Sequence, residues 1–171
     1  MSLSSSFSKP GQGYFLVAAS DDIVYSRVVG LGTMNNSIAF QQFIMNLERK
    51  DERKFIFDLS QCDGFDSTFM GILLGISREA KLVVLVNTLE EHSRILSEVG
   101  IDRMVHLCDS PVELPAIELQ RLESRAVSHD ERQRVVLNAH ENLVRLDSRN
   151  EEEFGQFVNL LRRELGDETP L

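Results

Sequence analysis

The chain has no tryptophan and few cysteines, tyrosines and prolines, with two, two and four among its 171 residues. Cys62 and Cys108 lie far apart and form no Cys-x-x-Cys pair, and the four histidines are scattered along the sequence. This spacing fits neither a zinc site nor the disulfide framework of a small secreted domain. We therefore expect two free thiols and no bound metal.

Long apolar runs are also missing. None approaches the roughly 18 residues that a membrane-spanning helix requires. The serine-rich first ten residues lack the apolar core of a secretory signal. These features predict a cytoplasmic protein that does not associate with a membrane.

Basic side chains are in deficit. Eighteen Lys and Arg face 27 Asp and Glu, which gives a formal net charge of −9. A nucleic-acid binder needs a basic surface to displace counterions from phosphates, so we expect no nucleic-acid partner. The apolar content of 42 % is ordinary for a globular protein, and the length allows one domain with an appendage.

Motifs of enzyme chemistry are absent from the sequence as well. It contains no Gly-Lys-Ser/Thr phosphate loop, and no nucleophile arrangement accompanies the histidines. The turn Gly30-x-Gly32-x-x-Asn35 has two of the three glycines of a dinucleotide fingerprint, but the strands before it read as a hairpin. We expect no enzyme and no cofactor, and nucleotide binding at residues 30–37 remains an alternative.

The hydrophobic pattern alternates between strands and helices after an opening hairpin. Residues 14–19 and 23–29 read as two strands joined by the turn Ser20-Asp21-Asp22. The remaining predicted elements are strands at 55–59, 82–86 and 105–107 and helices opening near Ser37, Ser67 and Thr88, the last ended by Gly100. This order indicates an α/β fold in which helices pack on a mixed sheet.

The C-terminal third changes character. Ser110-Pro111-Val112-Glu113 predicts a short helix that Pro115 ends, and residues 114–126 are ambiguous. Two capping boxes, Ser128 with Glu131 and Ser148 with Glu151, predict a helical hairpin over residues 130–166. The second helix carries an apolar stripe made of Phe154, Phe157, Val158, Leu161 and Leu165. We expect this stripe to pack within the same molecule, and a homodimer contact is the alternative.

The most informative segment is Asp66-Ser67-Thr68-Phe69-Met70-Gly71. It places two adjacent hydroxyls where a strand and short loop lead into the first turn of a helix. Free backbone N–H groups and the positive end of the helix dipole favour a phosphate at such a turn. The simpler alternative is that Asp66 or Ser67 is an ordinary N-cap.

The region from Phe55 to Leu107 resembles the STAS domain of bacterial anti-sigma factor antagonists, and the resemblance extends back to about Tyr14. The family signature is close to Asp-Ser-Ser-Gly-Leu-Gly and follows a strand that ends in Asp-Leu-Ser. Asp66, Ser67 and Gly71 match it, whereas Phe69 replaces a glycine and Met70 a leucine. The resemblance implies a STAS-like mixed sheet in residues 14–115, preceded by a disordered segment 1–13 and followed by a helical extension 116–171.

In that family a partner kinase phosphorylates the second hydroxyl, which corresponds to Thr68, with Ser67 beside it as a further candidate. The phosphate must come from a separate protein, because this chain has no phosphate cradle. The resemblance implies an anti-sigma factor with serine/threonine kinase activity as partner, together with a phosphatase. Among the expected partner-binding residues, Phe69 is expected to be an exposed anchor. The set lies in the motif and in two loops beside it: Asp63, Phe65, Asp66, Phe69, Met70, Gly71, Asn36, Ser37, Asn87 and Thr88.

A second interpretation assumes the same fold but no phosphorylation switch. A STAS domain also serves as a constitutive scaffold in a signalling or transport assembly, in which case Thr68 is never modified.

Overall fold

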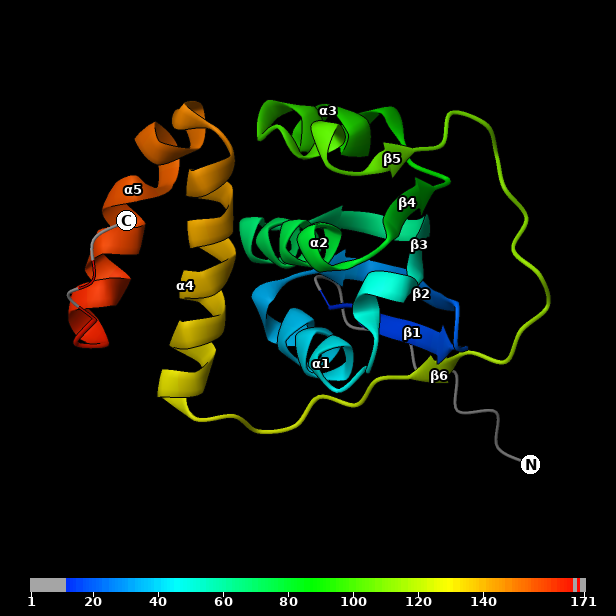
Figure 1. Cartoon of the computed structure of the whole chain (residues 1–171), viewed down its shortest axis with the longest axis horizontal. Helices are drawn as coiled ribbons and strands as arrows, with labels where there is room; N and C mark the ends of the chain where they lie inside the picture. Colours follow the sequence, from blue (N-terminus) through cyan, green and yellow to red (C-terminus); the bar gives the residue numbers. More distant parts are fainter. Residues whose placement is uncertain (1–11, 168, 170–171) are drawn as a thin grey trace.

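One mixed sheet of six strands organises the protein, in the order β5-β4-β3-β2-β1-β6 (Figure 1). The structure is a computed structural model that describes residues 12–167 and 169. The strands are β1 (Tyr14–Ala19), β2 (Ile23–Gly32), β3 (Lys54–Phe65), β4 (Leu82–Val86), β5 (His106–Leu107) and β6 (Gln120–Arg121). β1 pairs antiparallel with β2 and with β6, whereas β2, β3, β4 and β5 run parallel. The predicted α/β fold with its opening hairpin is confirmed.

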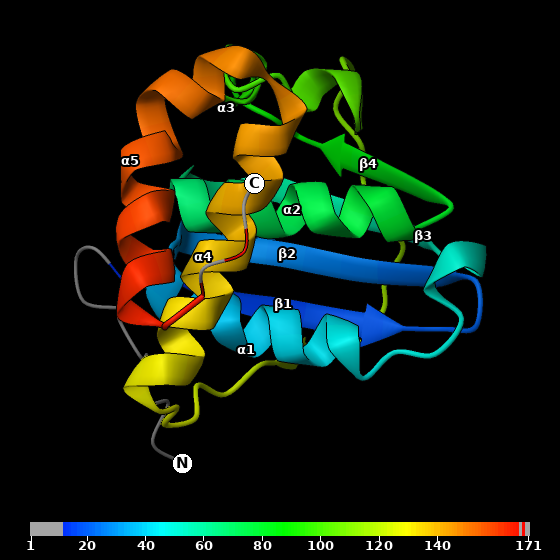
Figure 2. The ribbon, with the colours of Figure 1, turned by 60° about the vertical axis from the view of Figure 1, so that its left-hand side comes forward.

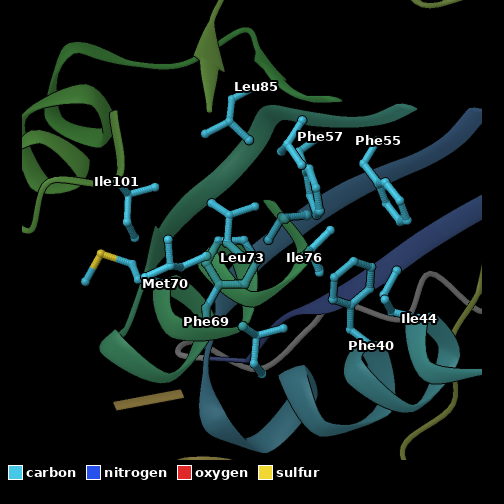
Figure 3. Close-up of a cluster of buried hydrophobic side chains, with 14 of the residues drawn as sticks. Phe40, Ile44, Phe55, Phe57, Phe69, Met70, Leu73, Ile76, Leu85 and Ile101 are labelled. Atoms are coloured by element: carbon cyan, nitrogen blue, oxygen red, sulfur yellow. The ribbon is translucent and has the colours of Figure 1, made fainter. Parts of the chain in front are cut away.

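Three helices follow strands of this sheet: α1 (Met34–Met45), α2 (Ser67–Glu79) and α3 (Glu90–Glu98). Two single turns of 3₁₀ helix, Lys50–Glu52 and Ile101–Arg103, follow α1 and α3. α1 and α2 lie against one face of the sheet (Figures 1 and 2). The core between these helices and the sheet contains the fully buried side chains of Phe15, Phe40, Phe55, Phe57 and Phe69. Figure 3 labels the last four of them.

The segment between β5 and β6 carries the chain from one edge of the sheet to the other, on the side away from the helices (Figure 1). The helix predicted at Ser110–Glu113 is wrong, because residues 108–119 have no helical structure. The Asn87 side chain binds both the N–H and the C=O of Val112, at 2.9 Å each. An extended chain also advances about 3.3 Å per residue against 1.5 Å in a helix, so it crosses the sheet in few residues.

The predicted helical hairpin is present as α4 (His129–Leu146) and α5 (Ser148–Glu164). Ser128 caps α4 through the N–H of Glu131, as expected. The cap of α5 is Asp147 instead of Ser148, because the Asp147 carboxylate accepts the N–H of Arg149. α4 packs on α2, so the hairpin forms an outer layer over the helices that cover the sheet (Figure 2).

Two further expectations concern the ends of the chain and membranes. The disorder predicted for residues 1–13 falls mostly outside the described residues. Among the helices of the described part, none is both long enough and apolar enough to cross a bilayer.

Candidate functional site

Asp66 fixes the start of α2 and joins it to α1. One carboxylate oxygen accepts the N–H of Phe69 at 2.9 Å, and the other accepts the N–H of Met34 at 2.8 Å. A single side chain therefore satisfies free donors at the amino-terminal ends of two helices. Because Asp66 provides the cap, the hydroxyls of Ser67 and Thr68 are not needed for that purpose.

The Ser67 hydroxyl, half-buried, is hydrogen-bonded to a histidine of α4. Its Oγ lies 2.8 Å from Nε2 of His140, and Nδ1 of His140 lies 2.7 Å from the carbonyl oxygen of Val136. The rings of Phe154 and Phe157 meet the imidazole edge-on. Burial lowers the pKa of His140, although the Val136 carbonyl and the nearby Asp66 oppose this. The imidazole is therefore neutral, its Nδ1–H donates to Val136, and its Nε2 accepts the Ser67 hydroxyl.

Thr68 is only 3 % exposed. It shares a face of α2 with Gly71 and Gly75, which lie three and seven residues further along the helix. That face lies against α4, since a Cβ on Gly71 would come within 2.1 Å of the Ala139 carbonyl oxygen. Nδ2 of Asn142 also donates to the Gly71 carbonyl at 3.1 Å. In this structure α4 covers the turn at which partner binding is predicted.

Phe69 and Met70 are core residues. They are 1 % and 6 % exposed, so the expected exposed aromatic anchor at Phe69 is wrong. The Phe69 ring packs against the rings of Phe15 and Phe65, with centroid distances of 5.9 and 5.4 Å. The large side chain at this position fills the space between β1 and the end of β3.

The predicted loop residues serve the scaffold in this structure. Asn36 and Ser37 are buried in the first turn of α1, where the Asn36 amide binds the backbone of Thr33 and Leu31. Asn87, with a left-handed φ of 56°, holds Asp58 and the segment at Val112.

The remaining three predicted residues lie nearer the surface. Asp63 is exposed, Thr88 is half-exposed, and Phe65 is half-buried between Phe69 and His92.

The sequence model of the STAS domain family matches residues 14–114. The chain belongs to the STAS domain family. Its fold is similar to the crystal structure of an anti-sigma factor antagonist from Mycobacterium paratuberculosis, at 21 % identity over 61 % of this chain and 92 % of that chain, with a TM-score of 0.49. It is also similar to the anti-sigma factor antagonist SpoIIAA in its unphosphorylated form, at 18 % identity over 57 % and 88 % of the two chains, with a TM-score of 0.39. A comparison with curated proteins finds no match.

The helical hairpin of this STAS protein lies beyond the matched residues, and its contacts with α2 were missed from the sequence. Ala139, His140 and Asn142 all touch the first half of α2. One signal could have found them. Gly71 and Gly75 are four residues apart inside a predicted helix, where glycine is costly, and such a pair indicates that another backbone approaches closely.

Neither Cys62 nor a cluster of metal-ligating side chains adds a reactive site to the STAS domain in the part of the chain that the structure describes. Burial raises the pKa of the Cys62 thiol to about 11, so it is protonated and inert in the folded protein. Among the described residues, no group of His, Cys, Asp and Glu is arranged to hold a metal ion.

The Gly30 turn has a structural role. Gly30 has a φ of 72°, and a Cβ there would come within 2.5 Å of the Gln12 carbonyl. The amide of Met34 at the following helix start is already bound by Asp66. A phosphate at this helix start would compete with a carboxylate, which weakens the nucleotide-binding alternative.

Proposed function

We propose that this protein is a cytoplasmic, non-enzymatic STAS switch that binds an anti-sigma factor with serine/threonine kinase activity. Phosphorylation at the start of α2, at Thr68 or its neighbour Ser67, releases that partner, and a phosphatase restores binding. The observation that carries the proposal is the pair of hydroxyls in the first turn of α2, on a STAS fold and next to a cap that Asp66 supplies alone.

The electrostatics of the turn explain why a phosphate there acts as a switch. A phosphate adds about −1.5 to −2 charges and three acceptor oxygens. The dipole of α2 stabilises it by roughly 0.3–1 kcal/mol, whereas the Asp66 carboxylate opposes it. A partner surface that removes water from this turn opposes it more strongly, and each 1.4 kcal/mol lost weakens binding about tenfold.

The two hydroxyls differ in burial and in hydrogen bonding. Thr68 occupies the family position but is buried, whereas Ser67 is half-buried and bonded to His140. The 2.8 Å between Ser67 Oγ and His140 Nε2 leaves no room for a phosphoryl group. Modification of either residue therefore requires movement at the contact between α2 and α4.

The decisive experiment combines phosphorylation with binding. The full chain is incubated with a purified anti-sigma factor kinase from the same organism and ATP, and phosphate is mapped by mass spectrometry in the parent, Ser67→Ala and Thr68→Val proteins. Binding is then compared for Thr68→Asp and for Ser97→Asp, a control at an exposed serine of α3. We expect phosphate at residue 67 or 68 and loss of binding in Thr68→Asp alone. Equal binding by both aspartate variants would refute the switch.

The burial of Thr68 gives weight to a second candidate, the constitutive scaffold. In that case the kinase adds no phosphate while a stable complex with another protein still forms. A homodimer through the C-terminal helices also remains a prediction, because Phe157 and Leu160 of α5 are 40 % and 51 % exposed. Sedimentation of the parent and of Leu160→Glu tests it.

A further inference from the structure

The contact between α4 and α2 includes several hydrogen bonds between polar groups. Ser67 bonds His140, Asn142 bonds the Gly71 carbonyl, and Arg78 of α2 bonds the Asn142 side chain at 3.0 Å. The apolar side chains of α4 that reach the main core form a stripe along the helix: Val135, Ala139, Leu143 and Leu146. The contact between α2 and α4 therefore combines an apolar stripe with hydrogen bonds that a competing surface could replace.

The hairpin is also a packing unit of its own. A second cluster of buried apolar residues joins α4 to α5 and consists of Val136, Leu137, Val144, Val158 and Leu161. Phe154 packs against both this cluster and the main core, and Met34 of α1 packs against this cluster. Beside it, the Arg162 guanidinium binds the Glu141 carboxylate at 2.7 Å, with both side chains buried. The contacts between α4 and α5 remain intact if the hairpin moves as one body.

One end of the hairpin is anchored and the other is tethered. Asn150 in α5 donates to the Val99 carbonyl at 2.9 Å, and Arg103 pairs with Asp147 at 2.8 Å, so the turn between the helices is fixed near α3. The start of α4 follows residues 122–128, which contain no helix or strand, and it contacts α1 through the Gln42–Glu131 and Arg132–Asn35 hydrogen bonds of 2.9 and 3.3 Å. This arrangement is that of a lid with a hinge at the α4–α5 turn.

Packing under the lid is incomplete on the side of α1. A cavity of about 140 Å³ lies among α1, α2 and α4, lined in part by Ile72, Gly75 and Asn142. A wider groove of about 850 Å³ separates the end of α1 at Met45 from the start of α4 at Val135. Close packing is what makes cores resist opening, so these spaces lower the barrier to separation.

We infer that the α4–α5 hairpin is a displaceable occupant of the face of α2 that carries Thr68, Gly71 and Gly75. It pivots on its anchored turn, and the Ser67–His140 hydrogen bond is the latch. The vacated face has glycines where α4 places Ala139, so it accepts a helix that presents a small residue at the crossing. This inference rests on the proposed function only for the identity of that helix, which belongs to the anti-sigma factor.

The test measures opening in the full chain without any partner. Thr68→Cys in a Cys108→Ser background reports access to the α2 face, and native Cys62 reports global unfolding because it is buried in the main core. Both sites are labelled with iodoacetamide in the same molecules and quantified by mass spectrometry. Ser67→Ala breaks the latch, and Ser77→Ala is the matched control, because the Ser77 hydroxyl bonds the Leu74 carbonyl of its own helix.

We expect residue 68 to be labelled at least tenfold faster than Cys62. Ser67→Ala should raise the rate at residue 68 about tenfold further and leave Cys62 unchanged, whereas Ser77→Ala should change neither rate more than twofold. Labelling of the two sites in step in every variant, or no response of residue 68 to Ser67→Ala, would overturn the inference. A hairpin that opens in a protein that binds no anti-sigma factor would refute the proposed function and leave this inference standing.

Discussion

Gly71 is the point at which a single methyl group should separate α4 from α2. A Cβ added there would lie 2.1 Å from the Ala139 carbonyl oxygen, whereas real Cβ contacts keep at least 3.0 Å. The two helices must therefore move apart by about 0.9 Å in Gly71→Ala, from 2.1 to 3.0 Å. The obstacle is backbone, so no side-chain rotation relieves it.

The expected cost follows from three contributions. Overpacking of this kind costs about 1–3 kcal/mol. The hydrogen bonds of Ser67 and Gly71 to α4 lengthen as the helices part, and each is worth about 1 kcal/mol. Alanine gains about 1 kcal/mol over glycine in a helix interior. The sum predicts that the free energy of unfolding falls by roughly 2–4 kcal/mol.

The chain offers two matched glycine-to-alanine controls. In Gly75→Ala the new Cβ meets only the Asn142 side-chain nitrogen, at 3.0 Å; its displacement costs about 1 kcal/mol of hydrogen bonding to Gly71, which the gain of alanine over glycine in a helix offsets. In Gly155→Ala of α5 it meets Glu151 Cγ at an ordinary 3.5 Å. Urea denaturation followed by circular dichroism should give near-neutral or stabilising effects for both controls. A Gly71→Ala protein as stable as Gly155→Ala would contradict the helix contact on which the lid depends.

Three further predictions concern the buried charges and thiols. Glu141→Gln should destabilise the hairpin by about 3–5 kcal/mol, because it leaves Arg162 buried without its counter-ion. Glu152→Gln, at an exposed site of α5, should have almost no effect, and urea denaturation of both variants tests this. The pKa values of His140 and His92 are lowered by burial below the ordinary 6.5, so the unfolded state binds more protons at mildly acidic pH. The histidine contribution to the free energy of unfolding should be constant above about pH 6.5. At lower pH the free energy of unfolding should decrease by at most about 1.4 kcal/mol per pH unit for each histidine. A His140→Gln variant with the same pH slope would exclude that residue as a cause. Cys108 should react with iodoacetamide in the folded parent, whereas Cys62, with a pKa of about 11, should react only on unfolding, and equal labelling of the two would contradict its burial.

Periodicity was enough to predict most of the STAS domain. The strands of the opening hairpin, the buried strand at 82–86 and the motif helix were all recognisable, because each has a pattern set by its own burial. The C-terminal hairpin was recognisable for the same reason. Such local patterns depend on nearest-neighbour sterics and on which face is covered.

Features set by tertiary contacts were not predictable in this way. A helix was expected at Ser110–Glu113, but the side chain of Asn87 takes the backbone groups of Val112 and holds it extended. β6 is only two residues long, and its place is decided by the free edge of β1. The sequence placed the motif hydroxyls correctly on α2. It did not predict that α4 covers them, because that helix comes some 70 residues later.

The two strands at the margins of the sheet, β5 and β6, have two residues each. Short outer strands offer a neighbouring molecule few unpaired backbone groups, which limits growth of the sheet from one copy to the next. β6 also occupies positions Leu16 and Val17, where an apolar strand would otherwise be open to pairing. The segment that leads from β5 to the C-terminal helices thus limits strand-to-strand aggregation by covering this edge of the sheet.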